Sequence, residues 1–345
     1  MWRGWSGGFW AEQARPWTIA LAVLLLIYPA IASDFFIFQI GAYSLLLGTV
    51  ALSLMMLAGY GGMVSLAQMT VAGFAGYMMA IFGTNSVGVH GLGWPWWVLI
   101  PAVILSAACL SALIGAIAVR TEGIYTIMIT LAIAVAFFYF TRQNYALFNG
   151  FTGFAGVAPP HVFGVDWRAP VPFYYLSLAI AAFFYFSVLF ASRSTYGLAL
   201  QAVRDNARRM NSLGYNVTLI RIFAYFLAGL IAGTAGIMLV WFNNRISPGS
   251  VGIDVAIDIL VIAVVGGLRH PIGPFLGALA FVLLENFAID LIDRERFNTV
   301  IGVAFLAVVF FSPDGLLGLW QRLRPHLIPR RRAARRVEGA ETPAE

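Results

Sequence analysis

The chain has 345 residues, of which 61% are hydrophobic and only 10% are charged, and its formal net charge is +6. Soluble globular proteins are about 25% charged. The low charge of this chain and its mean hydropathy of +0.85 together exclude a soluble fold of this size and indicate an integral membrane protein. A single cysteine, Cys109, excludes a disulfide framework and a thiol metal site. The basic pI near 9.7 does not indicate nucleic-acid binding, because seven arginines crowd into the last 24 residues, where membrane topology accounts for them.

Apolar runs long enough to cross a bilayer follow one another through most of the chain. A spanning helix needs roughly 20 apolar residues, and by that criterion polar and Pro/Gly clusters delimit about ten runs. They lie near residues 17–33, 38–58, 63–83, 95–119, 124–141, 173–192, 222–242, 254–268, 273–290 and 298–312. Only residues 59–62 separate the second run from the third, so one of these spans is expected to be broken or re-entrant. The sequence predicts an all-α, polytopic membrane protein with about ten transmembrane helices.

The arginines indicate an orientation for these spans. With the N-terminus in the cytoplasm, sixteen arginines fall on the cytoplasmic side and five outside, as the positive-inside rule expects. An even number of spans then places both termini in the cytoplasm. The outer loop 142–172 is expected to form a folded cap or a short lateral helix. Tryptophans at span ends are expected to be interface anchors, namely Trp94, Trp96, Trp97, Trp241 and Trp320.

A polar segment, residues 193–221, interrupts the apolar runs and carries five arginines. Ser194 and Thr195 suit a helix start, and Gly214 suits a helix stop. Between them, helical spacing places Leu200, Val203, Ala207 and Met210 on one face and Leu198, Ala202, Asp205 and Arg209 on another. Two interpretations stay open: a solvated linker with positive-inside arginines, or a helix that docks a cytoplasmic motor.

A few polar residues and glycines inside the spans are candidates for a translocation path. Ser65 and Gln68 share a helix face, and a buried glutamine in lipid needs the partners that a wet path provides. Thr130 shares a face with Thr126, and each hydroxyl either bonds its own helix or lines the path. Asp258 lies at the start of an apolar run. It is either a helix-start acid near the outer interface, which the helix dipole favours, or a functional residue inside the span. The glycines either allow close packing or line the path, namely Gly59, Gly61, Gly62, Gly73 and Gly76.

Short motifs occur along the chain in a definite order. They comprise residues 59–68; Arg120 with 123–125 and 128–132; Gly150, Gly153, Gly156 and Val157; 202–206, 208–209 and 213–216; 246–248; and 266–268 with 273–274 and 277–278. In this order they resemble the permease subunits of branched-chain amino acid ATP-binding-cassette (ABC) importers, the LivM-like family. The resemblance covers residues 38–318 or thereabouts. Departures from the family pattern, which bear on the substrate more than on the fold, are Met63, Ala67, Phe151, Thr152, Ala207 and Arg269.

The resemblance implies a transport subunit, not an enzyme, for branched-chain or related amino acids in a bacterial inner membrane. Residues 1–320 would form the permease domain, with a cytoplasmic coupling loop at 193–221, and 321–345 a basic, disordered tail. Its partners would be a second related permease, two cytoplasmic ATPase subunits and an outer solute-binding protein, with no nucleic acid. The chain lacks a phosphate-binding loop, so it needs no cofactor of its own and ATP would bind to the ATPase subunits.

In this scheme, closure of the ATPases moves the helix near 197–213 as a rigid body. The residues assigned to coupling are Arg204, Asp205, Arg208, Arg209 and Gly214, and those assigned to the translocation path are Ser65, Gln68, Thr130 and Asp258. One alternative keeps the importer class but changes the cargo to urea, short amides or a simple sugar. A second alternative is a self-contained secondary transporter or channel, a class that usually shows more paired charges inside the membrane.

Overall fold

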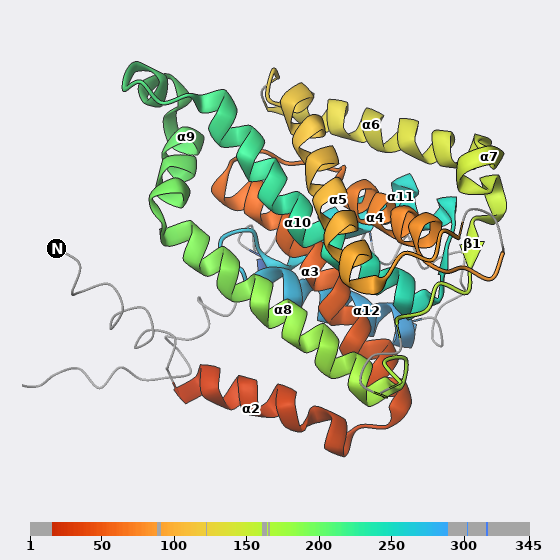
Figure 1. The fold of residues 1–345 in the computed structure, drawn as a ribbon. Coiled ribbons are helices and arrows are strands. Elements are labelled where there is room, and N and C mark those ends of the chain that lie inside the picture. Colours follow the sequence, from red (N-terminus) through yellow and green to blue (C-terminus); the bar gives the residue numbers. More distant parts are fainter. Residues whose placement is uncertain are drawn as a thin grey trace, which may run out of the picture.

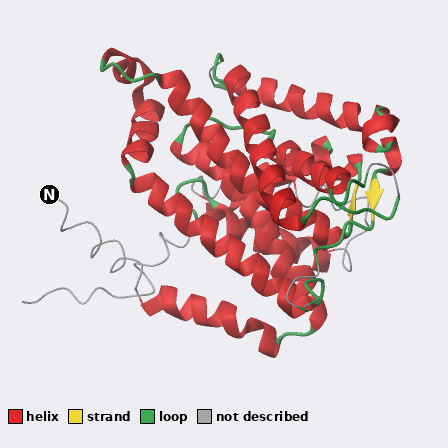
Figure 2. Cartoon of the chain, in the orientation of Figure 1, coloured by secondary structure: helices red, strands yellow, loops and turns green. Residues whose placement is uncertain are grey.

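The computed structural model describes residues 16–87, 91–121, 123–160, 164, 166–288, 302 and 315–316. Within them the chain is a bundle of helices (Figures 1 and 2). The α-helices are α2 (Pro16–Ile31), α3 (Tyr43–Met55), α4 (Gln68–Phe82), α5 (Trp96–Ala118), α6 (Ile124–Gln143), α7 (Tyr145–Phe148), α8 (Pro170–Arg193), α9 (Thr195–Ser212), α10 (Val217–Asn243), α11 (Ile253–Gly266) and α12 (Gly273–Ala288). The shorter elements are η1 (Phe36–Ala42), η2 (Met56–Tyr60), η3 (Gly150–Thr152), η4 (Pro248–Val251), β1 (Phe154–Ala155) and β2 (Arg245–Ile246).

The helices follow the expected spans closely in the part of the chain that is described. A helix covers each apolar run from 17–33 to 273–290, whereas the expected run 298–312 lies outside the described residues apart from residue 302. Five helical segments there are long and apolar enough to cross a membrane: Phe36–Tyr60, α5, α6, α8 and α10. The outer loop also contains the expected short helix, which is α7.

The third span departs from expectation because α4 begins only at Gln68, not at residue 63. Its 15 residues are roughly 22 Å long at 1.5 Å per residue, less than the roughly 30 Å of a hydrocarbon core. Residues 61–67 before it are not helical, and most of them are buried in the protein. Irregular backbone at membrane depth is tolerated only where protein surrounds it or it lines a wet cavity. A short third helix that follows a buried, non-helical stretch is consistent with the prediction that one of the two neighbouring spans is broken or re-entrant.

The centre of the bundle is the continuous segment Phe36–Tyr60, whose α3 packs mainly against α10 and α12. In its most apolar window 83% of the residues are buried, against 22% in α6, which lies along the outside of the bundle. Small residues let the central helices approach closely. A methyl group on Gly236 of α10 would overlap the Ala72 carbonyl of α4, and one on Gly229 would lie 2.5 Å from Ser111 of α5. Gly236 and Gly229 therefore allow close packing of the central helices.

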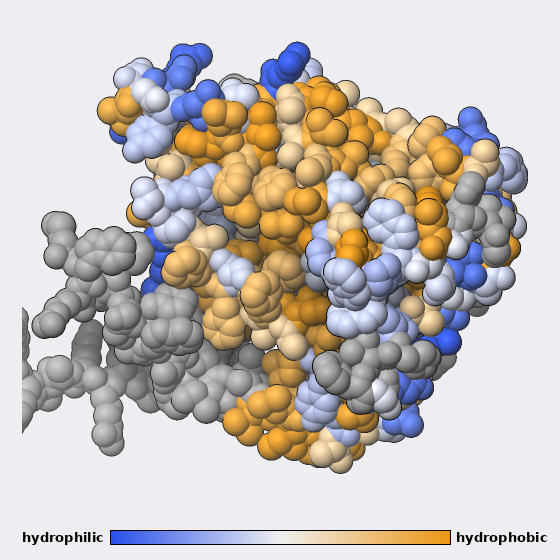
Figure 3. All heavy atoms as spheres, viewed as in Figure 1, coloured by the Kyte–Doolittle hydropathy of each residue, from blue (hydrophilic) through white to orange (hydrophobic). Residues whose placement is uncertain are grey.

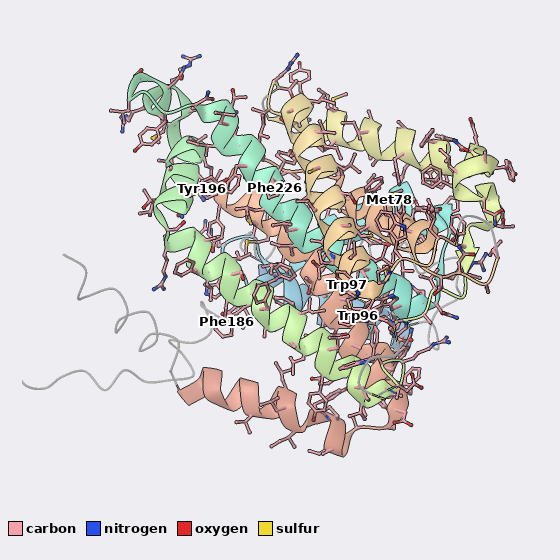
Figure 4. All side chains as sticks on the ribbon, viewed as in Figure 1. Met78, Trp96, Trp97, Phe186, Tyr196 and Phe226 are labelled. Carbon is pink, nitrogen blue, oxygen red and sulfur yellow. The ribbon has the colours of Figure 1, made fainter. Side chains whose placement is uncertain are left out.

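The two ends of the bundle are polar and the belt between them is apolar. Figure 3 shows, on the face in view, hydrophilic side chains over α9 and at the opposite edge, with hydrophobic side chains between them. At the start of α5, Trp96 and Trp97 are exposed, as expected of interface anchors (Figure 4). Trp241 is only 6% exposed because it lies in the core, so its interpretation as an anchor is wrong.

Candidate functional site

The polar segment 193–221 forms helix α9, which stands out from one end of the bundle between α8 and α10 (Figure 1). Ser194 caps its first turn, because its hydroxyl oxygen accepts a hydrogen bond from the Gly197 amide at 3.1 Å. After the last turn Gly214 has a φ of +86°, a left-handed conformation that glycine adopts without strain. The predicted apolar face is confirmed, since Leu200, Val203 and Met210 are buried whereas Leu198 is exposed.

Helix α9 is not continuous, because Asn206 has extended backbone angles of φ −157° and ψ 91°. The Asn206 side chain accepts a hydrogen bond from the Arg209 amide at 2.9 Å, as an N-cap residue does at the start of a new helix. The expectation of one rigid helix is therefore wrong. An inner piece, 195–205, and an outer piece, 207–212, meet at this residue.

The inner piece is fastened to the break between the second and third spans. The Arg204 guanidinium donates a hydrogen bond to the Gly59 carbonyl, and its aliphatic stem lies over Gly62. Leu200 lies against Gly61 in the same stretch. Gly59 in turn abuts the Leu268 carbonyl, where a methyl group would overlap the oxygen. The base of α9, the glycine-rich break and the turn between α11 and α12 therefore form one packed junction.

Two further hydrogen bonds fix the inner piece to the helices on either side. The Tyr196 hydroxyl donates to the Ile220 carbonyl of α10 at 2.8 Å, and burial raises the pKa of this phenol. The Gln201 amide donates to the Ser192 carbonyl of α8 at 2.8 Å. Figure 4 shows Tyr196 at the base of α9, with Phe226 of α10 nearby. The inner piece must therefore move together with α8, α10 or both.

The outer piece presents charged and apolar side chains to solvent. Arg208 and Arg209 are exposed, and so are Leu213 and Tyr215 just beyond the helix end. Exposed arginine and tyrosine beside an apolar side chain are typical of protein interfaces. Arg204 and Asp205 at the hinge form an ion pair of 2.9 Å that is partly exposed, so it adds little stability.

Three of the predicted path residues meet where α4 begins. Ser65, Gln68 and Thr130 are each at most 1% exposed. The Thr130 hydroxyl accepts from the Leu66 amide at 3.1 Å and also lies 3.0 Å from the Thr126 carbonyl of its own helix. The Thr130 hydroxyl is thus both an acceptor and a donor. From α6 it provides a hydrogen-bond partner for a backbone amide just before the start of α4.

Gln68 is the member of this group whose side chain can still donate a hydrogen bond. Its carbonyl oxygen accepts from the Ser53 hydroxyl at 3.1 Å, while its buried amide nitrogen has no hydrogen-bond partner among the described residues. An unpaired buried donor is costly unless water or a ligand reaches it. The structure therefore leaves Gln68, more than Ser65 or Thr130, available to a molecule inside the bundle.

Asp258 does not join that group. It lies in the first half of α11, which begins at the end of the bundle opposite α9. One buried oxygen of Glu285 has no hydrogen-bond partner within the described ranges. In the same ranges no three His, Cys, Asp or Glu side chains gather closely enough to hold a metal ion.

A cavity of about 150 Å³ near that end was not predicted. It lies between α3, α4, α10 and the segment 245–255, and residues far apart in the sequence line it, among them Tyr43, Leu47, Gly73, Leu239, Asn243 and Ser250. A second unpredicted feature is the antiparallel pair of β1 and β2, in which Phe154 is opposite Ile246. The sequence signals for both were modest: glycine at 73, 153 and 156, and the Ser-Pro-Gly-Ser run at 247–250.

Comparisons with known proteins agree on one kind of protein. Residues 36–309 match the family described as "Branched-chain amino acid transport system / permease component". The chain is similar to the ribose import permease protein RbsC of Haemophilus influenzae, at 22% identity over 90% of this chain and 95% of the relative. It is also similar to the branched-chain amino acid permease protein LivM of Escherichia coli, at 23% identity over 90% of this chain and 75% of the relative.

A shorter alignment, to the branched-chain amino acid permease protein BraD of Pseudomonas aeruginosa, has 30% identity over 38% of this chain and 42% of the relative. No solved structure gives a significant match.

Proposed function

We propose that this chain, which belongs to the family of branched-chain amino acid transport permease components, imports branched-chain or related amino acids under the control of helix α9. The chain is a transport component and a multi-pass membrane protein, as its family and its apolar helices require. The observation that carries the proposal is the link from Arg204 of α9 to Gly59 in the break before α4. A force on α9 acts through this link on the backbone inside the bundle.

The contacts suggest a sequence of movements. A partner grips the exposed outer piece through Arg208, Arg209 and the residues up to Gly214, and Asn206 allows that piece to adjust its angle. The inner piece then displaces Gly59 through Arg204, which Asp205 holds in place by its ion pair. Because residues 61–67 connect Gly59 directly to α4, the displacement reaches Ser65 and Gln68. Path opening would therefore begin at the break in the third span.

The partners and the orientation complete the proposal. The end that carries α9 faces the cytoplasm, because the segment 193–221 at that end carries five arginines. Two ATPase subunits bind there and hold the ATP, so the chain itself carries no cofactor, and both of its termini lie on this side. A second, related permease pairs with it in a bacterial inner membrane. A solute-binding protein delivers cargo at the opposite end, toward which Asp258 lies.

Reconstitution tests this function directly. The chain is placed in liposomes with its second permease, its ATPases and its binding protein, and the uptake of leucine is measured with and without ATP. We expect uptake only with ATP and all partners. Replacing Arg208 and Arg209 by glutamate should abolish uptake while membrane insertion stays normal. Leucine transport by the chain alone, driven by a sodium or proton gradient, would instead establish the secondary transporter.

The similarity to a ribose import permease supports a second candidate, an importer of the same class that carries a simple sugar. The two cargoes are separated by binding measurements on the cognate solute-binding protein, which is titrated with leucine and with ribose. A protein that binds ribose and not leucine would overturn the amino acid assignment and leave the role of α9 intact.

A further inference from the structure

The cavity between α3, α4, α10 and the segment 245–255 has a lining of mixed character. Leu47, Leu239 and Val240 give it an aliphatic wall, and Gly73 leaves room on the side of α4. The hydroxyl of Ser250 also lines it and makes no hydrogen bond within the described part of the chain. Ligand sites in proteins typically combine an apolar wall with a few polar groups of this kind.

A positive charge lines this cavity, and a negative charge lies on a neighbouring helix. Arg245 of β2 is part of the lining; it is exposed, and its guanidinium donates a hydrogen bond to the Thr152 carbonyl at 3.4 Å. On α11, Val255 lines the cavity and Asp258 is three residues further along, so both lie on the same helix face. A cation in the lining and a carboxylate about one helical turn along α11 from a lining residue match the two charges of a zwitterion.

We infer that this cavity is a cargo subsite that holds an aliphatic α-amino acid during transport. Arg245 would bind the carboxylate, Asp258 would attract the ammonium group, and the wall around Leu47 and Leu239 would take the side chain. The inference rests on the proposed function and deepens it, because it places the cargo at a defined point inside this chain.

The lining favours an amino acid over a sugar. Protein sites that bind sugars present an open aromatic face and many hydrogen-bonding groups, whereas the aromatic residue of this lining, Tyr43, is already stacked on Phe242 at 5.1 Å. The Asn243 amide is bonded to the Leu239 carbonyl of its own helix at 3.1 Å. The polar groups left over in the lining are the charged Arg245 and the Ser250 hydroxyl, and so small a set suits a small zwitterion with an apolar side chain.

The segment that covers this subsite is connected to the outer loop. Val251 packs on Gly73 at the cavity, and β2, just before it, pairs with β1 of the loop 144–169. A methyl group on Gly153 in that loop would overlap the Ile246 carbonyl, so the two segments are in direct contact. A protein that docks on the outer loop would therefore shift the segment 245–251 and change access to the cargo.

Two neighbouring residues of η4 provide a matched test. Ser250 lines the cavity, whereas Gly249 is exposed and a Cβ atom there would lie 3.8 Å from the Ser247 hydroxyl, an ordinary contact distance. In the complete reconstituted importer, Ser250→Leu fills the cavity and should lower leucine uptake about tenfold, the cost of a badly overfilled site. Gly249→Leu adds the same side chain to solvent and should leave uptake unchanged. Equal uptake by the two variants would overturn the subsite.

Protection from labelling gives a readout that does not depend on a large side chain. Single cysteines, Ser250→Cys and Gly249→Cys, are placed in a Cys109→Ala background and labelled with a small methanethiosulfonate in the assembled complex. We expect leucine to slow labelling at position 250 and not at 249. Arg245→Gln should weaken that protection about tenfold, because a charge-assisted contact to the carboxylate is lost.

The possible results of these experiments distinguish a failure of the proposed subsite from a failure of the proposed function. If neither leucine nor ribose changes labelling at position 250 while the complex still imports leucine, the subsite is wrong and the proposed function stands. Protection by ribose alone would overturn the amino acid as occupant. If the wild-type complex imports no leucine with ATP, the proposed function fails and the inference falls with it.

Discussion

Replacing Arg204 with methionine isolates the contact between α9 and the break before α4. Methionine keeps an unbranched apolar stem over Gly62 but removes the guanidinium that donates to the Gly59 carbonyl. The inner piece of α9 should then separate more often from the break. Leu200 and Gln201 should still hold it in its average position, so the fold is expected to persist.

The magnitude follows from the exposure of this contact. A hydrogen bond from a charged donor contributes about 1.5–3 kcal/mol to stability when it is well shielded. Here the Arg204 side chain is 38% exposed, and its ion pair with Asp205 is more exposed still. Solvent screening reduces the contribution of such groups, so we expect a loss of about 1–1.5 kcal/mol in the local opening free energy. That loss corresponds to roughly tenfold more frequent opening.

Hydrogen exchange on the protein in lipid nanodiscs measures this opening. The amides of Gly62 and Met63 donate to the Ala58 and Leu57 carbonyls, so they report on the break directly. Their exchange should be about tenfold faster in Arg204→Met, since local opening exposes them. In Arg208→Met, which changes an exposed residue of the outer piece, it should match the wild type. Unchanged exchange in Arg204→Met, or equal acceleration in both variants, would refute the link between α9 and the break.

Three further predictions concern packing, capping and pH. Gly59→Ala should lower the stability of the detergent-solubilised protein by about 1–3 kcal/mol, because its methyl group overlaps the Leu268 carbonyl. Thr130→Val should cost about 1–3 kcal/mol by leaving the Leu66 amide buried without its acceptor. Burial and the nearby charge of Arg193 hold the pKa of His270 below its ordinary value of 6.5, so the folded protein favours neutral His270. Stability from this group is therefore present above pH 6.5 and is lost as the pH falls below it, which thermal unfolding between about pH 8 and pH 5 will measure.

Each of these predictions has a matched control. Gly249→Ala adds a methyl group that lies at an ordinary 3.8 Å from the Ser247 hydroxyl, so it should leave the melting temperature unchanged. Thr130→Ser keeps the hydroxyl and should recover most of the loss, and Thr234→Val should cost less, because Thr234 bonds only the Leu230 carbonyl of its own helix. His270→Asn keeps an acceptor for the Ile272 amide but cannot titrate. If its stability falls with acid as steeply as that of the wild type, the assignment of the pH dependence to His270 is wrong.

The sequence by itself determined the membrane class, the order of the spans and the faces of α9. Those features depend on composition and on the spacing of apolar residues along one helix, which are local properties. The same locality explains why Leu200, Val203 and Met210 were placed on the buried face correctly. The break before α4 was also predicted, because only the glycine-rich residues 59–62 separate the second apolar run from the third.

Only the tertiary structure decided what each polar group contacts. The sequence grouped Thr130 with Ser65 and Gln68 as path residues, but the fold uses the Thr130 hydroxyl to bond the Leu66 amide, 64 residues away. It places Asp258 in the first half of α11, and it joins Arg204 to Gly59 across 145 residues. The kink at Asn206 was missed because an asparagine inside a helical pattern also fits an uninterrupted helix, and only the surrounding contacts choose between the two. Contacts between distant segments depend on how helices pack, and helical periodicity carries no information about which helix becomes the neighbour.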